Sequence, residues 1–528
     1  MTAERISIYD TTLRDGAQTQ GVDFSAADKA ALAREIDALG IDYVEGGWPG
    51  ANPTDDAFFA SPPALKHARL AAFGMTRRSG RSAANDPGLA ATLASGTKVA
   101  TLVGKTWDFH VKVALGAELV ENVEMIAESI AHVSGRLDEV IFDAEHFFDG
   151  YKANRTYALD CVKAAHAAGA RWIVLCDTNG GVLPDEVERI VGEVAHLIPG
   201  GRLGIHCHND TENAVANSLA AVRAGARQVQ GTLNGLGERC GNANLVSVIP
   251  SLMLKMGYTT SLGEAGLKRL THVSRLLDER LNRSPDRHAA YVGEAAFAHK
   301  GGLHVSAVEK DPRSYEHIDP AAVGNRRHVV VSDQAGRSNL LARLRELGIE
   351  VEVTHPKLGT LLEQVKAREF EGYSYDGAEA SFELMARRLI ESVPEYFKLQ
   401  SFRVLDERRW NARGELVTLS EATIKVEVGG QRTMTVAEGN GPVNALDTAL
   451  RQALIPVFPE LGEVRLTDYK VRILTPQDGT KAVTRVMIET TGGLETWSTV
   501  GVSANVIDAS YLALHDSLTY KLWRAGRR

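Results

Sequence analysis

The sequence predicts an α/β protein: a (β/α)8 TIM barrel, then a helical linker and lid region, then a C-terminal α+β domain. Two observations predict the barrel. Eight short apolar runs alternate with amphipathic helical stretches over roughly 250 residues, which matches this fold in count and length. The turn after the first run also lacks GxGxxG, the phosphate-binding fingerprint of the competing open, doubly wound sheet.

The eight predicted strands are short apolar runs, most of them ended by turn residues. They cover residues 6–9, 43–46, 69–73, 99–103, 139–142, 172–176, 203–206 and 228–232. Helices are predicted between them, starting at Ser25 and Pro184 and covering 118–133, 155–168 and 213–224. Pro184 suits a helix start because proline is tolerated in the first turn. The glycine-rich stretch 235–241 follows the last strand and has the wrong spacing for a dinucleotide site.

The pattern changes twice after the barrel. Helices are predicted at 338–347 and 355–370, and then at 444–454 and 509–523 among strands at 421–428, 469–474 and 483–489. We therefore expect three parts: a catalytic barrel over 1–262, linker and lid subdomains over 263–397, and a regulatory domain over 398–528. Glycine-bearing loops at 438–442 and 492–493 suit either a small ligand or plain turns.

Composition excludes several classes of protein. A net charge of -8 and a pI near 6.1 give no reason to expect nucleic acid or an anionic membrane surface as a partner. No apolar run approaches the roughly 18 residues of a membrane helix. The four cysteines form no CxxC pair and the N-terminus enters a strand at once, so we expect a soluble cytoplasmic protein with reduced thiols.

The first strand runs into YDTTLRDGAQ, residues 9–18, which carries the first candidate site residues. Arg14 can hold a carboxylate through two parallel hydrogen bonds, and Asp15 is a hard oxygen ligand for a divalent cation. A strand-end turn with solvated charges is the alternative.

His206 and His208 end the seventh strand, where alternate side chains face the same way. Both imidazoles can therefore reach one metal, while Cys207 points outward. With Asp15 and Asn242, they form a mixed nitrogen and oxygen set suited to Mg, Mn or Zn. The lack of cysteine ligands indicates a catalytic site rather than a structural one. For Asn242, a capping or turn role is the alternative.

Acids also end strands five and six. Asp143 and Glu145 share one face of strand five, at the mouth where proton transfer would occur, although pairing with arginines would explain them equally well. His304 lies beyond the barrel in a glycine-rich segment that could close over the site as a lid.

Four segments resemble the signatures of the acyltransferase metalloenzymes of the 2-isopropylmalate, homocitrate and citramalate synthase group: YDTTLRDGAQ, HCHND, GLGERCGNANL and FAHKGGLHVSAV. The resemblance covers essentially the whole chain. The forms DAEHFFDGYKAN and HKGGLHVSAV are most similar to the citramalate-forming branch. This resemblance implies a metal-dependent Claisen-type condensation of acetyl-CoA with pyruvate, with thioester hydrolysis, in isoleucine biosynthesis.

The resemblance also implies roles for individual residues. It assigns the metal to Asp15, His206, His208 and Asn242. It assigns Arg14 to the oxo acid and, as a catalytic residue, to the alkoxide that develops on it, and it assigns Thr178 to the substrate carboxylate, with Gln18 in support. It assigns acid/base work to Glu145, His304 and, as a weaker candidate, Tyr315. Many relatives have an aspartate two positions after the lid histidine, where this chain has Ser306, so a histidine–carboxylate pair there is in doubt.

The segments EGNGPVNALDTAL and WSTVGVSANVIDASYLAL resemble the regulatory domain of these synthases, which implies a homodimer with isoleucine as effector. Three alternatives stay open: a 2-isopropylmalate or homocitrate synthase, a retro-aldol lyase of the 3-hydroxy-3-methylglutaryl-CoA type, and an amino-acid sensor with a vestigial barrel. Pyruvate is small, so bulky residues should line its pocket. The candidates by position are Phe73, Trp107, Phe142 and Phe147, although packing within the barrel is their simpler explanation.

Overall fold

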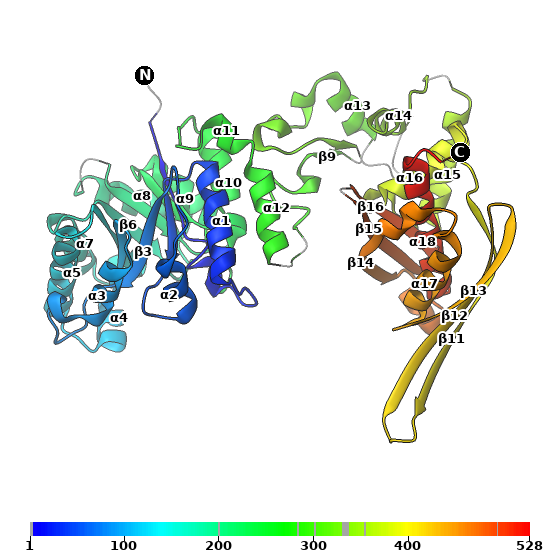
Figure 1. Cartoon of the computed structure of the whole chain (residues 1–528). Coiled ribbons are helices and arrows are strands. Elements are labelled where there is room, and N and C mark those ends of the chain that lie inside the picture. Colours follow the sequence, from blue (N-terminus) through cyan, green and yellow to red (C-terminus); the bar gives the residue numbers. More distant parts are fainter. Residues whose placement is uncertain are drawn as a thin grey trace. The chain divides into compact units, whose positions relative to one another are not determined.

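The computed structural model describes residues 4–198, 201–281, 283, 285–299, 302–329, 337–352, 355–493 and 495–527. The chain forms two compact units, which are treated separately (Figure 1). The first unit contains residues 1–297 and 317–327, and the second contains 298–316 and 328–528. Among the described residues, no helix combines the length and the apolar character needed to cross a membrane.

The first unit is a closed barrel of eight parallel strands in sequence order, with β1 paired to β8, which confirms the predicted fold class. The strands are β1 (Ser7–Asp10), β2 (Tyr43–Gly47), β3 (Arg69–Met75), β4 (Val99–Lys105), β5 (Glu139–Glu145), β6 (Trp172–Asp177), β7 (Leu203–Cys207) and β8 (Gln228–Gly231). Each predicted run therefore forms a strand, with ends that differ by at most three residues.

Helices follow the strands and surround the barrel. Ser25 begins the first of them through a capping box with Asp28. They are α1 (Ala26–Leu39), α2 (Pro53–Ala60), α3 (Pro87–Ala94), α4 (Asp108–His110), α5 (Leu119–Ser134), α6 (Phe147–Ala153), α7 (Arg155–Ala167), α8 (Pro184–Ala195), α9 (Ala214–Arg223), α10 (Leu245–Pro250), α11 (Gly263–Leu267) and α12 (Leu270–Arg280).

The alternation of side chains along each strand gives the barrel two buried layers. The inner layer contains Tyr9, Tyr43 and Trp172, among others. The larger outer layer packs strands against helices, and it includes Cys207, as predicted. It also includes Phe142 and Phe147, both fully buried. The suggestion that these two rings line a substrate pocket is therefore wrong, because they face the helices and not the barrel mouth.

The second unit begins with a parallel pair, β9 (Ala298–His299) and β10 (His328–Val329), and helices α13 (Gly302–Lys310), α14 (Arg337–Glu346), α15 (Lys357–Phe370) and α16 (Glu379–Ile390). Two three-stranded antiparallel sheets follow, each completed by a helix. The first is β11 (Phe397–Trp410), β12 (Leu416–Val428) and β13 (Gln431–Gly439) with α17 (Pro442–Leu454). The second is β14 (Val464–Ile473), β15 (Thr484–Gly492) and β16 (Glu495–Ser503) with α18 (Val506–Arg524). The sequence did not predict β11. Most of that strand is exposed, and a bulge between Leu399 and Ser401 interrupts the alternation of its apolar side chains.

Candidate metal and substrate site at the barrel mouth

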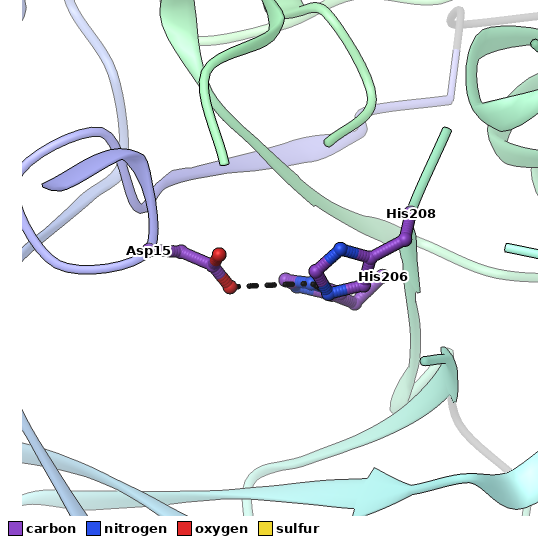
Figure 2. A group of neighbouring side chains, drawn as sticks. All are labelled: Asp15, His206 and His208. Atoms are coloured by element: carbon purple, nitrogen blue, oxygen red, sulfur yellow. Dashed lines mark hydrogen bonds and ion pairs between the residues drawn. The ribbon is translucent and has the colours of Figure 1, made fainter. Parts of the chain in front are cut away.

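Three buried side chains meet at the carboxyl ends of the strands (Figure 2). Asp15 lies in the loop after β1. His206 lies near the end of β7, and His208 directly follows that strand. One ligand atom from each lies within 4.8 Å of the others. The His206 Nε2 atom is 3.6 Å from Asp15 Oδ2 and 3.4 Å from His208 Nε2. The structure thus brings Asp15 together with two histidines that lie about 190 positions later in the sequence.

The loop that carries Asp15 is held by its own polar groups. The Asp15 amide donates to the Thr11 carbonyl at 2.9 Å, and the Thr12 hydroxyl accepts from the Leu233 amide at 2.9 Å. The first bond closes the loop on itself, and the second attaches it to the segment that follows β8. The position of Asp15 is therefore determined by the closure of the barrel.

Asn242 lies beside this cluster. Its Nδ2 group donates to Asp15 Oδ1 at 3.0 Å and to the Leu236 carbonyl at 3.1 Å. Gly241 lets the chain turn here, since its φ is +91° and a Cβ atom would lie 2.0 Å from the Gly235 carbonyl oxygen. Within the described part of the chain, the buried Asn242 Oδ1 atom has no hydrogen-bond partner. That oxygen is available to a ligand.

The charge states also suit a divalent cation. Burial would raise the pKa of Asp15, but Arg14, His206 and His208 outweigh it and lower that pKa to about 2. Burial lowers the pKa of both histidines, that of His208 to about 4. The site therefore presents a carboxylate and two neutral imidazoles, which are the forms that bind metal.

The spacing of the two imidazoles supports this fit. Two nitrogens bound to one tetrahedral ion at 2.0–2.1 Å lie about 3.4 Å apart, and the two Nε2 atoms are at that separation. Gln230 Oε1 lies 3.0 Å from His206 Nδ1. Because an N–H at Nδ1 donates to this oxygen, the lone pair of His206 stays on Nε2, on the side of Asp15.

Arg14 is held in one orientation beside the cluster. Its Nε donates to Glu45 Oε2 at 2.7 Å, a terminal nitrogen lies 3.2 Å from Asp15 Oδ2, and its guanidinium lies over the Phe73 ring at 4.0 Å. Burial would lower the pKa of Arg14, but the charges of Glu45 and Asp15 outweigh it and raise that pKa further. Arg14 is thus a permanent cation with a fixed plane.

Sequence reasoning missed two residues that support this arrangement. Glu45 is fully buried, and it accepts hydrogen bonds from Tyr9 and Thr11 as well as from Arg14. The only sequence feature that could have indicated Glu45 is that it is an acidic residue inside an otherwise apolar strand. Gln230 joins His206 to Asp143, because its Nε2 donates to Asp143 Oδ1 at 3.0 Å. The sequence feature that could have indicated Gln230 is a polar side chain on the inner face of the last barrel strand.

Glu145 and Thr178 lie at the ends of two paired strands: Glu145 is the last residue of β5, and Thr178 directly follows β6. The Glu145 carboxylate pairs with the Lys105 ammonium group. The Thr178 hydroxyl accepts from the His146 amide at 2.8 Å, which leaves its own proton free to donate. Gln18, in contrast, is exposed at the surface.

His304 and Tyr315 belong to the second unit. Both side chains are exposed, and their rings stack with centroids 4.2 Å apart. The pair is a local feature of α13 and the segment after it. Their roles in acid/base chemistry stay predictions.

Asp143 should make stability depend on pH. Burial, with the nearby charge of Glu45, raises its pKa to about 8, from an unfolded value of about 3.9. The stability that its protonated form contributes is complete below about pH 4 and is lost as the pH rises through 8, at most about 1.4 kcal/mol per pH unit. The parent protein should therefore lose stability between pH 5 and pH 8, whereas Asp143→Asn should not. The melting temperature of Asp143→Asn should accordingly rise relative to that of the parent protein over this range. Thermal melts across this range test the effect.

The exposed Asp160→Asn variant is the matched control, and its melting temperature should follow the parent protein at every pH. A constant difference between Asp143→Asn and the parent protein would contradict a raised pKa.

A closed (β/α)8 barrel with two histidines, a carboxylate and an arginine at its mouth defines a class of TIM-barrel enzymes with a cation site at the strand ends. The HMGL-like family model matches residues 5–276. The chain belongs to the HMGL-like family and, within it, to the group of the (R)-citramalate synthases.

Several (R)-citramalate synthases are similar to the chain over almost its whole length. It is 51% identical to an (R)-citramalate synthase of Aquifex aeolicus over 99% of this chain and 98% of that protein. It is 51% identical to the (R)-citramalate synthase of Geobacter sulfurreducens, over 98% of this chain and 98% of that protein. It is 44% identical to the (R)-citramalate synthase of Sulfolobus acidocaldarius, over 99% of this chain and 98% of that protein. Residues 291–371 match the homocitrate synthase post-HMGL domain-like model, and residues 377–522 match the LeuA allosteric (dimerisation) domain.

Proposed function

We infer that this protein acts as a citramalate synthase, an acyltransferase that condenses acetyl-CoA with pyruvate and then hydrolyses the thioester to give (R)-citramalate and CoA. The observation that carries this inference is the 44–51% identity to five (R)-citramalate synthases over nearly the full chain. Identity is lower to a probable 2-isopropylmalate synthase of Methanopyrus kandleri, at 33%, and to the 2-isopropylmalate synthase of Rhodopseudomonas palustris, at 30%, which favours pyruvate over 2-oxoisovalerate.

We propose that Asp15, His206, His208 and Asn242 hold a divalent cation, of Mg, Mn or Zn type. The support is their proximity, their charge states and the unpaired Asn242 oxygen. When bound, the ion would polarise the ketone of pyruvate and offset the negative charge that develops on its oxygen.

Arg14 and Thr178 would position the oxo acid. The guanidinium of Arg14 is held by Glu45 and Phe73, so it can offer hydrogen bonds to the keto oxygen without losing its orientation. The free hydroxyl proton of Thr178 would bind the substrate carboxylate. Gln18 would support the loop from its exposed position.

Glu145 and His304 would share the proton transfers. We assign removal of the acetyl methyl proton to Glu145, because its carboxylate lies at the end of β5, at the barrel mouth, where the Lys105 ammonium group pairs with it. The methyl carbon then forms a bond to the keto carbon of pyruvate, and the keto oxygen becomes an alkoxide beside Arg14. His304, with Tyr315 stacked on it, would serve the later attack of water on the thioester, which releases the CoA thiol.

Release of free CoA from acetyl-CoA tests this function. We expect pyruvate to exceed 2-oxoisovalerate and 2-oxoglutarate by at least about tenfold in kcat/KM, the effect of one or two methylenes in a fitted pocket. A chelator should abolish turnover, and added metal should restore it. Preference for a larger oxo acid would overturn the citramalate assignment. Acetoacetate release from 3-hydroxy-3-methylglutaryl-CoA would favour the lyase alternative.

The C-terminal part supports a regulatory proposal. Because residues 377–522 match an allosteric dimerisation domain, we propose that 398–528 forms a homodimer and binds isoleucine, while 1–262 is catalytic and 263–397 links the two. A cytoplasmic location belongs to the same proposal.

Isoleucine is expected to lower kcat or raise the KM for acetyl-CoA in the full-length enzyme, because an effector acts by binding two states of the protein differently. Initial rates with and without isoleucine measure this effect, with leucine and valine as comparison ligands. Unchanged kinetic constants with isoleucine would reject this effector.

A further inference from the structure

A second cluster of ligand-type side chains lies at the ends of β4 and β5. It consists of His110 at the end of α4, Glu145 at the end of β5 and His146 before α6, and one ligand atom from each lies within 4.8 Å of the others. The two imidazole rings meet edge to face, with centroids 4.5 Å apart. His146 has a φ of +57°, so the backbone turns sharply directly after Glu145.

The imidazole of His146 is oriented by a carboxylate behind it. Asp149 Oδ2 lies 3.2 Å from His146 Nδ1, and it also accepts from Asn179 Nδ2 at 2.9 Å. A carboxylate at Nδ1 holds the proton on that nitrogen and leaves the lone pair on Nε2, the usual arrangement behind a metal-binding histidine. Asn179 in turn fixes the carboxylate.

His110 also offers a free lone pair. Its Nδ1 atom is buried and has no hydrogen-bond partner among the described residues. Burial, with the charge of Lys105 nearby, lowers the pKa of His110, so its imidazole is neutral at physiological pH. An unpaired buried polar atom is unfavourable unless something binds it.

The cluster already holds a cation. The Lys105 ammonium pairs with Glu145, and the Trp107 ring lies 5.5 Å from the His146 ring and 6.3 Å from the His110 ring. Two imidazoles and one carboxylate suit Zn, Co, Ni or Cu, whereas Mg prefers oxygen ligands.

We propose that His110, Glu145 and His146 form a second metal site, distinct from the Asp15 cluster and selective for Zn2+ or Co2+ over Mg2+. Metal binding there displaces Lys105 from Glu145. The bound metal also occupies the Glu145 carboxylate, which then cannot remove the methyl proton of acetyl-CoA. Metal binding at this site therefore inhibits the enzyme, a consequence that rests on the proposed role of Glu145.

Titration of metal-free protein with Co2+, followed by absorbance and equilibrium dialysis, tests the site. The parent protein should bind two equivalents, whereas His110→Ala and His206→Ala should each bind one. The exposed His272→Ala variant is the matched control and should bind two. One equivalent in the parent protein, or two in His110→Ala, would overturn the proposal. Because binding does not depend on turnover, this result is separate from the outcome of the CoA assay.

Two further variants locate the ion. Cobalt in the second site should quench the fluorescence of Trp107, and Trp107→Phe should remove that component. Asp149→Asn should weaken the second site about 10–100-fold, the usual effect of removing the partner of a metal-binding histidine. The same variant should need about 10–100-fold more Zn2+ for inhibition in saturating Mg2+. Equal inhibition of both proteins would show that Zn2+ acts elsewhere.

Discussion

Asp15→Asn should lower kcat by at least about 10³-fold, because loss of a charged metal ligand removes about 4 kcal/mol or more of transition-state stabilisation. The substitution keeps the size of the side chain, and the residue lies at the barrel mouth. The barrel should therefore fold, as shown by an unchanged far-UV circular dichroism spectrum. CoA release and bound metal are measured on the same sample, and both should fall.

The stability cost has a defined sign. The pKa of Asp15 is lowered to about 2, so its ionised form stabilises the fold above its unfolded pKa, and this contribution disappears as the pH falls towards 2. Asp15→Asn should accordingly melt earlier than the parent protein at pH 7, and the difference should shrink in acid. The exposed Asp23→Asn variant serves as control. More than a tenth of the parent turnover with normal metal content would refute the assignment of Asp15.

Arg14→Lys is expected to reduce kcat/KM for pyruvate about 10²–10³-fold, the usual loss when one preorganised donor to a developing oxyanion is removed. Lysine keeps the charge, but it is a point cation without the planar fork that binds Glu45 and rests on Phe73. The KM for acetyl-CoA should change little. Steady-state kinetics with each substrate varied in turn separates the two effects.

Arg34→Lys, an exposed position on α1, is the matched control and should keep full activity. Added guanidinium should partly restore an Arg14→Ala variant if the lost group acts at the substrate. Wild-type kinetics in Arg14→Lys would mean that only the charge of Arg14 matters.

The barrel was predictable because each of its strands is a short, nearly continuous apolar run. Parallel strands buried on both faces produce such runs, and the eight of them match the observed strands within three residues at each end. The C-terminal sheets were predicted less completely. Strands β11, β13 and β16 were not predicted. Most of β11 and β13 is exposed, and in β11 a bulge between Leu399 and Ser401 interrupts the apolar alternation that marks a half-buried strand.

The grouping of Asp15 with the two histidines followed from one rule, that the carboxyl ends of barrel strands share a mouth. The rule does not tell which buried residues form hydrogen bonds to these side chains and orient them. Glu45 and Gln230 were therefore missed, although they hold Arg14 and His206 in place. The wrong pocket assignment of Phe142 has a related cause, since position near a strand end does not tell which face a ring occupies.

The sequence by itself determined the fold class, the family and the set of ligand-type residues, because these depend on local runs, turns and motifs. The tertiary structure alone decided the charge states and orientations at the mouth. The pKa of Asp15 and that of Asp143 move in opposite directions, to about 2 and about 8. Both side chains are buried carboxylates. They differ in the cations and hydrogen-bond donors that the closed barrel brings within reach, and those partners come from distant parts of the chain.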